Sequence, residues 1–151
     1  MTCLSNNMRA FLMMIRTAEG TAGPDGYRTL FGGGLFEGFE DHPRQRITRK
    51  LGGTPITSSA AGAYQFLERT WDEVQAKLDL PDFSPNSQDR GAVELIRRRG
   101  ALKLVEVGHF EQAVEKVRKE WASMPGAGYS QPEKKLAFLQ EVYEDNGGTI
   151  A

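Results

Sequence analysis

Apolar residues near the start of the chain recur at i, i+3, i+4 and i+7, the spacing that places side chains on one face of an α-helix. They are Met8, Phe11, Leu12 and Ile15. This pattern predicts an amphipathic helix over residues 8–20, with Asn6 or Asn7 available as N-cap. Gly20 suits the position after the last helical residue, because glycine readily adopts a left-handed conformation. The helix is therefore expected to end at Glu19.

The following segment, residues 21–53, is rich in glycine and poor in helix formers. Short strands are expected at residues 27–31 and 35–39, separated by three consecutive glycines, and a further strand at residues 46–50. Residues 52–55 are expected to form a mobile loop of the kind that often borders a binding cleft. The sequence thus predicts a small antiparallel sheet after the first helix.

Helical signals return after residue 58 and continue to the end of the chain. They are a capping box at residues 70–73 with a stripe through Leu67, Trp71, Val74 and Leu78; Ser84 and Pro85 as N-cap and first helical residue; a short helix over 101–107; a stripe through Phe110, Ala113, Val114, Val117 and Trp121; and a capping box at 130–133 before Leu136, Leu139, Val142 and Tyr143. Five or six helices with one β segment after the first indicate an α+β protein.

Glu19 lies on the apolar stripe of the first helix, four residues after Ile15 and seven after Leu12. Partial burial disfavours the charged form of its carboxyl, and the negative end of the helix dipole disfavours that form again. Both effects raise the pKa of Glu19. A carboxylic acid that keeps its proton near neutral pH is suited to general acid catalysis, although most glutamates in a last helical turn are solvated surface groups.

The composition bounds the other possibilities. A length of 151 residues fits one domain over residues 1–151, and 19 basic against 20 acidic residues give a net charge of −1, which argues against nucleic acid as a partner. No apolar run is long enough to insert into a membrane, and no secretory signal is expected. Cys3 is the single cysteine, which excludes a disulfide within the chain.

Few residues suggest metal or nucleophilic chemistry. The chain has two histidines, His42 and His109, and lacks His-Glu-x-x-His, Cys-x-x-Cys, Gly-x-Ser-x-Gly and phosphate-loop motifs, so no metal or cofactor is expected. Four basic residues are expected to be solvated surface groups: Arg44, Arg46, Arg49 and Lys50. Three tyrosines beside glycines are candidates for sugar contacts, since tyrosine offers an apolar face and a hydroxyl: Tyr27, Tyr64 and Tyr129.

Several short motifs occur together and in order. They are residues 10–12, 19–21, 26–27, 41–43, 61–62, 64–65, 81–85, 87–89, 99–102 and, most specific of all, Trp-Ala-Ser-Met-Pro-Gly-Ala-Gly-Tyr at 121–129. On these residues, over nearly its full length, the chain resembles the phage lambda endolysin family, the lysozyme-like lytic transglycosylases of tailed phages. The resemblance implies an α+β, lysozyme-like fold, mainly helical with a small antiparallel sheet after the first long helix.

The same resemblance implies cleavage of the β-1,4 bond between N-acetylmuramic acid and N-acetylglucosamine in peptidoglycan without consumption of water. Glu19 would protonate the leaving oxygen and then take the proton of the muramic C6 hydroxyl as that oxygen attacks C1, which gives a 1,6-anhydro product. One carboxylate suffices, whereas ordinary glycosidases use a pair. The resemblance further implies that Ser59, Tyr64 and Gln65 hold the N-acetyl groups and orient the sugar, with residues 52–55 and 126–135 as the rims of the cleft.

Arg28 departs from the relatives. T-even phage lysozymes, which share the fold but hydrolyse, carry an Asp nine residues after the Glu, and the lambda group usually carries Asp after its Gly-Tyr pair; Arg28 occupies that place here. Nearby acids that could supply a second carboxylate are Asp25, Glu37, Glu40 and Asp41. A hydrolytic muramidase on the same fold therefore stays open, and so does a non-catalytic cell-wall-binding module, which the presence of Glu19 disfavours.

The resemblance also predicts the setting of the protein. The expected partner is the glycan strand of peptidoglycan, bound by a monomer. The chain is expected to be made in the cytoplasm of a bacterial host without a signal peptide, and to act on the wall in the periplasm after the membrane has been permeabilised. Lysis of the host cell would follow.

Overall fold

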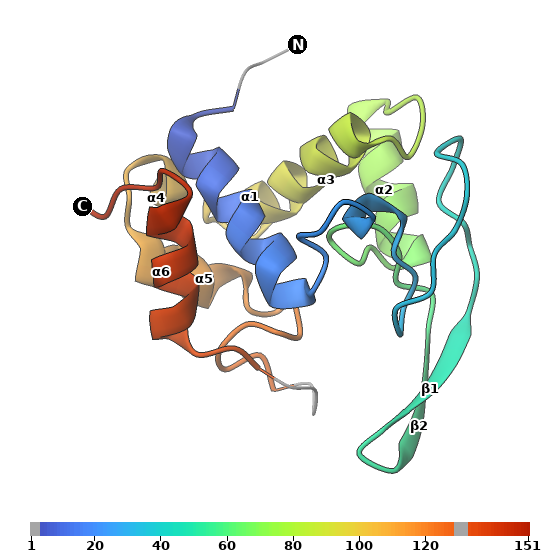
Figure 1. Cartoon of the computed structure of the whole chain (residues 1–151). Coiled ribbons are helices and arrows are strands. Elements are labelled where there is room, and N and C mark those ends of the chain that lie inside the picture. The colour runs from blue at the N-terminus through green and yellow to red at the C-terminus, as the bar shows by residue number, and fades with distance from the viewer. Residues whose placement is uncertain (1–3, 129–132) are drawn as a thin grey trace. The chain divides into compact units, whose positions relative to one another are not determined.

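The computed structural model describes residues 4–128 and 133–151, and it is mainly helical with one small antiparallel sheet (Figure 1). Its elements are α1 (Asn6–Glu19), the 3-10 helix η1 (Gly26–Arg28), β1 (Ile47–Leu51), β2 (Thr54–Ser58), α2 (Glu68–Leu78), α3 (Pro85–Arg98), α4 (Leu102–Glu106), α5 (Phe110–Val117) and α6 (Leu136–Asp145). The predicted α+β class is confirmed. None of the helices in the described ranges is long and apolar enough to cross a membrane.

The chain divides into two compact units. Unit 1 combines Met1–Glu19 with Val93–Ala151, and unit 2 is the continuous segment Gly20–Ala92. The boundaries fall at the end of α1 and inside α3. Glu19, the candidate acid, is therefore the last residue of unit 1 before the chain enters unit 2.

Unit 1 is built around α1, which packs against α4 and α6. The predicted apolar stripe of α1 is fully buried, and the Phe11 ring meets the rings of Phe110 and Tyr143 edge-on, with centroids 6.0 and 6.5 Å apart. The stripe predicted for the helix that begins at Phe110 is also buried, although α5 ends at Val117 and the last residue of the stripe, Trp121, lies in the turns that follow. Each buried Met, Phe, Leu, Ile or Val of these stripes contributes about 1.5–3 kcal/mol by leaving water. These contacts fix the far end of the helix that carries Glu19.

Unit 2 has its own aromatic core. The rings of Trp71 and Phe83 lie 4.7 Å apart and those of Phe66 and Trp71 lie 5.0 Å apart, both edge-on. Trp71 and Val74 of the predicted stripe are buried, whereas Leu67 is 49% exposed because it precedes the first residue of α2. The core of unit 2 thus holds α2 and the segment before α3.

Three predicted helix starts need correction. The N-cap of α1 is Ser5, whose Oγ accepts the N–H of Met8 at 3.0 Å, rather than Asn6 or Asn7. The second helix, α2, begins at Glu68, before the predicted capping box at residues 70–73. The N–H of Glu68 donates to the Oγ of Ser59 at 3.0 Å, so Ser59 supplies the cap. Most of the capping box at 130–133 lies outside the described residues, and α6 begins at Leu136.

The predicted sheet is placed differently from expectation. The strands expected at residues 27–31 and 35–39 are replaced by η1 and isolated bridges, from Thr29 to Leu35 and from Leu30 to Ala61. The three glycines form a tight turn, in which the N–H of Leu30 donates to the carbonyl of Gly34 at 2.6 Å. Among the described residues on either side of this turn, no continuous ladder of strand hydrogen bonds forms.

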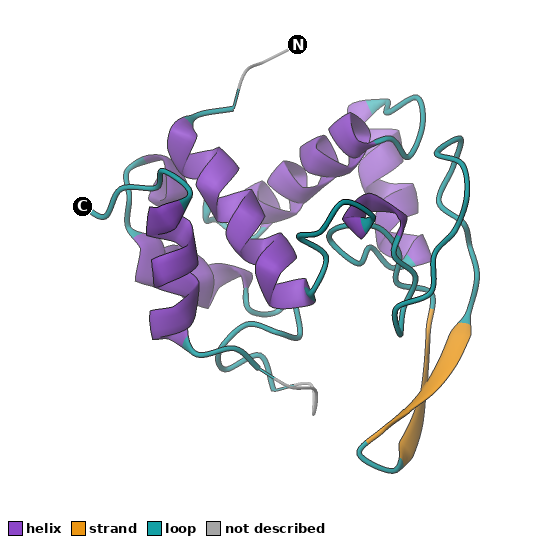
Figure 2. Cartoon of the chain, in the orientation of Figure 1, coloured by secondary structure: helices purple, strands orange, loops and turns teal. Residues whose placement is uncertain are grey.

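The strand expected at residues 46–50 is confirmed as β1, and it pairs with β2 in a hairpin (Figure 2). Residues 54–55, expected in a mobile loop, belong to β2. Gly52 and Gly53 alone form the turn, with φ of 63° and 87°, as a two-residue turn with left-handed central residues requires.

Candidate active site

Glu19 ends α1, and its position follows from the residues on either side of it. Gly20 has φ +80°, the left-handed conformation that terminates a helix. Ile15, one turn earlier on the same face, is completely buried, so the Glu19 side chain extends the apolar stripe and is half-buried. Burial is the largest influence on this carboxyl, and it raises the pKa of Glu19 above its ordinary value of 4.5.

Ser123 is the hydrogen-bond partner of Glu19. Its hydroxyl donates to Oε2 of Glu19, and its backbone N–H also donates to that carboxyl. Both bonds favour the ionised form and lower the pKa of Glu19, although less than burial raises it. The carboxyl therefore has two neutral donors for its anionic state while burial favours its protonated state.

Sequence reasoning gave Ser123 no role. The residue lies inside the most specific motif of the resemblance, but 104 residues separate it from Glu19 and no local pattern links the two. Its segment follows α5 as a series of turns, in which N–H of Met124 donates to the carbonyl of Trp121 at 3.0 Å. Trp121 and Met124 are both buried, which seats Ser123 against the core of unit 1.

Two of the predicted sugar-contacting tyrosines come together in unit 2. The rings of Tyr27 and Tyr64 lie 6.4 Å apart, edge-on, and their hydroxyls both donate to Oδ1 of Asp89, at 2.8 and 2.6 Å. Tyr27 is half-buried, whereas Tyr64 is 1% exposed. The glycines near Tyr64 indicated a turn but not the burial of its ring, and its contact with a sugar stays a prediction.

Gln65 adopts a left-handed backbone conformation with φ +50°. Its Nε2 donates to the carbonyls of Gly62 and Thr29 at 2.9 and 3.1 Å, which fixes the side-chain amide to the backbone around it. Ser59 is engaged in the cap of α2 described above. The remaining candidate, Tyr129, lies outside the described residues.

Gln88 organises the small-residue motif that carries Tyr64 and Gln65. It is completely buried, its Oε1 accepts the N–H of Ala63 at 2.8 Å, and its Nε2 donates to the carbonyls of Tyr27 and Phe83 at 3.0 and 2.8 Å. A side chain at Gly62 would collide with this amide, so glycine is required there. One side chain thus provides hydrogen-bond partners for three backbone groups, the N–H of Ala63 and the carbonyls of Tyr27 and Phe83.

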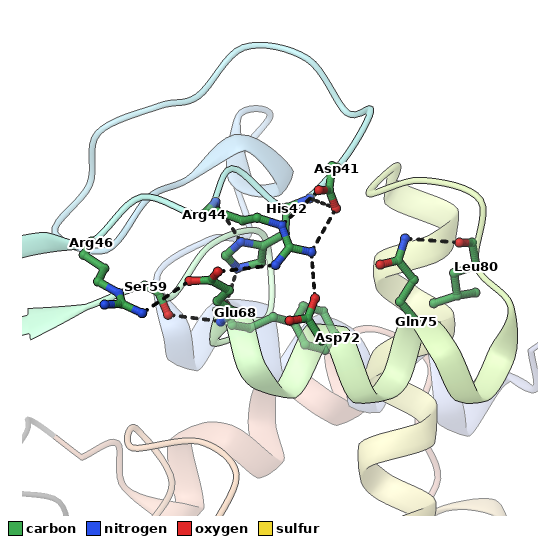
Figure 3. A network of polar contacts seen from close by, with 10 residues as sticks. Asp41, His42, Arg44, Arg46, Ser59, Glu68, Asp72, Gln75 and Leu80 are labelled. Atoms are coloured by element: carbon green, nitrogen blue, oxygen red, sulfur yellow. Dashed lines mark hydrogen bonds and ion pairs between the residues drawn. The ribbon is translucent and has the colours of Figure 1, made fainter.

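Arg44 is the centre of an ion-pair network rather than a solvated residue (Figure 3). Its guanidinium lies 3.0 Å from Asp41, 2.7 Å from Asp72 and 3.4 Å from Glu68. The hydrogen bonds from Arg44 lower the pKa of Asp41 and of Asp72. Arg46 also reaches Glu68, at 3.8 Å. The expectation of solvated surface groups is therefore corrected for Arg44 alone; Arg46, whose side chain is 75% exposed, and Arg49 and Lys50 are exposed as expected.

His42 lies beneath this network and is 2% exposed. Its Nε2 donates to the carbonyl of Phe66 at 2.8 Å, and its Nδ1 accepts the N–H of Arg44 at 3.0 Å, which fixes one neutral tautomer. Burial lowers the pKa of His42, in agreement with that assignment. The ring serves the packing of unit 2.

Arg28 stacks on an aromatic ring at the position where a second acid was sought. Its guanidinium carbon lies 4.8 Å from the centroid of Phe39. The candidate acids Asp25, Glu37 and Glu40 are exposed. Within the parts of the chain that the structure describes, no three acidic, histidine or cysteine side chains gather as they would around a metal ion.

Comparison with known proteins identifies the family. A family model described as Endolysin matches residues 9–150. The chain belongs to the Endolysin family. It is 40% identical over 153 residues to the endolysin of Escherichia phage lambda, covering 97% of this chain and 95% of that one, and 40% identical over 157 residues to the endolysin of Escherichia phage P2, covering 96% and 95%.

A solved structure described as bacteriophage lambda lysozyme complexed with a chitohexasaccharide aligns with this endolysin over 100% of both chains, with TM-score 0.92 and 39% identity. The probable transglycosylase SceD of Staphylococcus aureus is 44% identical over 69 residues, which cover 40% of this chain and 30% of SceD. The protein is thus a phage endolysin with a lysozyme-like fold, in a class of enzymes that degrade the bacterial cell wall.

Proposed function

We propose that this endolysin is a peptidoglycan lytic transglycosylase in which Glu19 is the single catalytic carboxyl. The observation that carries the proposal is the environment of Glu19, a half-buried carboxyl with a raised pKa whose partners are the hydroxyl and N–H of Ser123. Burial favours the protonated form of the carboxyl, which is the form a general acid needs. The partial match to a protein named as a probable transglycosylase is in accord with this reaction.

In the first step, protonated Glu19 transfers its proton to the glycosidic oxygen while the bond from that oxygen to C1 of the muramic acid breaks. Positive charge develops at C1 and the ring oxygen, and Glu19 becomes a carboxylate. The two donors of Ser123 stabilise this new charge without moving. Because the Ser123 hydroxyl binds Oε2, the transferred proton is assigned to Oε1.

In the second step, the Glu19 carboxylate accepts the proton of the muramic C6 hydroxyl while O6 forms a bond to C1. The product is a 1,6-anhydro ring, and Glu19 is again protonated. One carboxyl serves as acid and then as base, and no water is consumed. Two features support the absence of a partner acid: Arg28 stacks on Phe39, and Asp41 is bound by Arg44.

The substrate is proposed to be the glycan strand of peptidoglycan, by analogy with the lambda lysozyme that was solved with a chitohexasaccharide. Among the candidates, Tyr27 and Gln65 are proposed to contact the N-acetyl sugars. Buried Tyr64 and the capping Ser59 are proposed to position the segment that holds Gln65. The role of Tyr129 stays a prediction, as do a single catalytic domain, a monomer, and action in the periplasm without metal or cofactor.

A hydrolytic muramidase is the second candidate, since the solved relatives are described as lysozymes. Digestion of purified peptidoglycan in H₂¹⁸O, followed by mass spectrometry of the fragments, separates the two reactions. The transglycosylase yields anhydromuramic ends that are one water lighter and carry no ¹⁸O. Muramic acid ends labelled with ¹⁸O would instead establish hydrolysis. Glu19→Gln, digested in parallel, controls for contaminating enzymes.

A further inference from the structure

Glu133 binds the backbone of the loop that follows Ser123. Its Oε1 accepts the N–H of Gly126 at 3.0 Å, and its Oε2 accepts the N–H of Gly128 at 3.1 Å. Both carboxylate oxygens are thus used on one short stretch of chain. The two N–H donors lower the pKa of Glu133, so the group is ionised whenever the enzyme operates near neutral pH.

The backbone is shaped to make these two bonds. Gly126 and Gly128 both have φ +78°, the left-handed conformation, and alternate with Ala127 so that both N–H groups reach one carboxylate. Any residue other than glycine would be strained at either position. This arrangement resembles an anion-binding nest whose anion is a side chain of the same chain.

A second tie lies directly beside the first. The N–H of Lys134 donates to the carbonyl of Ser123 at 2.8 Å. The segment at 133–134 therefore holds the loop at two places, at Ser123 itself and at the glycines that follow. On its other side the loop is anchored by the buried side chains of Trp121 and Met124.

We propose that Glu133 is a positioning residue for the catalytic acid, because its clamp on Gly126 and Gly128 keeps Ser123 in hydrogen-bonding register with Glu19. This inference rests on the proposed role of Glu19. Glu133 binds Gly126 and Gly128, whereas the hydrogen-bond partner of Glu19 is Ser123, so Glu133 acts on the acid through the loop. Loss of the clamp loosens the two bonds that Ser123 donates, and burial then acts on Glu19 with less opposition.

The influences on the pKa of each carboxyl are known. The influences on Glu19 are its burial and the two donors of Ser123, and those on Glu133 are the two glycine N–H groups and slight burial. Arg118 lies beside the clamp, since its Nη1 would lie 3.4 Å from a Cβ added at Gly126, and Lys134 and Lys135 follow Glu133 along the chain. Two routes for a shift in the titration of Glu19 after a change at Glu133 are thus to be separated by experiment: Ser123, and a repositioned Arg118.

The test is the pH profile of kcat/KM for Glu133→Ala, with release of muropeptides as the assay. We expect kcat to fall about ten-fold and the alkaline limb, which reports deprotonation of the acid, to move to higher pH. Glu115→Ala, on the exposed face of α5, is the matched control and should leave both unchanged. Glu133→Asp should recover part of the activity, since a carboxylate is retained.

Ser123→Ala and the double variant complete the experiment. If Glu133 acts through Ser123, the loss in the double variant is smaller than the sum of the two single losses, because Ser123→Ala already removes one of the two bonds that the clamp holds. An unmoved alkaline limb in Glu133→Ala, or fully additive losses, would overturn the inference. An active Glu19→Gln would reject the proposed function itself, whereas an inactive Glu19→Gln with an unmoved limb in Glu133→Ala rejects only the role of Glu133. Glu133→Ala is also made in a protein that carries Arg118→Ala. If the alkaline limb still moves to higher pH in that double variant, Arg118 does not carry the effect.

Discussion

Glu19 of unit 1 and Asp41 of unit 2 are carboxyl groups that their surroundings drive in opposite directions. Glu19 is half-buried at a helix end and meets only neutral donors from Ser123, so burial raises its pKa. Asp41 is largely exposed and lies 3.0 Å from the guanidinium of Arg44, which lowers its pKa. The first group is prepared to give up a proton, and the second is a permanent anion in a structural network.

The difference shows what an acid catalyst requires from a fold. A cation beside Glu19 would stabilise the carboxylate before reaction and remove its proton at neutral pH. A hydroxyl and an N–H stabilise the carboxylate less, so they can assist it after proton transfer without discharging it beforehand. The ion pairs of Arg44, by contrast, hold the segment before β1 and have no need of a titrating group.

The largest expected effect is on turnover, which should depend on Glu19 and not on Asp41. Glu19→Gln should reduce turnover about 10³-fold or more, since it removes the proton donor, while Asp41→Asn should stay within about two-fold of the wild type. Clearing of peptidoglycan suspensions measures both, with circular dichroism to verify folding. Comparable activity in Glu19→Gln and the wild type would reject the assignment of the acid.

The next effect concerns the partners of the carboxyls. Ser123→Ala removes the hydroxyl that stabilises ionised Glu19, so kcat should fall about ten-fold and the alkaline limb of the pH profile should rise. Ser87→Ala is the matched control, because its hydroxyl donates to the carboxylate of Asp82 at 2.8 Å in unit 2. That variant should keep the activity profile of the wild type. Equal profiles for both variants would show that Ser123 does not tune the acid.

The smallest effect is on stability, and its sign differs between the two carboxyls. The folded-state pKa of Glu19 is raised, so its contribution is present below pH 4.5 and is lost as the pH rises through the folded value. Glu19→Gln should therefore increase the midpoint of thermal unfolding at pH 7 by a few degrees. The increase stays small because the two donors of Ser123 offset part of the cost of burying the carboxylate.

Asp41 should behave in the opposite way. Its pKa is lowered, so its contribution is present above pH 3.8 and is lost as the pH falls through the folded value. Asp41→Asn should slightly lower the unfolding midpoint at pH 7, by little because the pair is exposed. Calorimetry from pH 4 to pH 8 measures both variants. A stabilising Asp41→Asn with a destabilising Glu19→Gln would invert the comparison.

The sequence predicted what depends on neighbours along the chain. The end of α1 at Glu19 followed from an apolar stripe and Gly20, and the core helix from Phe110 followed from its own periodicity. Strand pairing was less accessible, because a run of glycines at 32–34 is compatible with a hairpin or with a turn too tight for one. Residues 54–55 were expected in a loop because they follow Gly52 and Gly53, although they pair in β2.

The site was only half predictable. Periodicity located Glu19, but its partner Ser123 is 104 residues away and depends on how the turns after α5 fold. Tyr64 was recognised from the glycines near it, whereas its burial follows from ring contacts with Tyr27 and Phe66 and from the bond of its hydroxyl to Asp89, at 2.6 Å. Contacts of this kind are products of tertiary packing and leave no local pattern to read.

The most direct test of the proposed acid is titration of the Glu19 carboxyl itself. Side-chain ¹³C shifts of a protein labelled at glutamate, assigned by comparison with Glu19→Gln, give the midpoint for this one group. We expect a midpoint above the ordinary 4.5, and a higher one still in Ser123→Ala. A midpoint at or below 4.5 would mean that Glu19 has lost its proton before it meets the substrate, and would contradict its role as the acid.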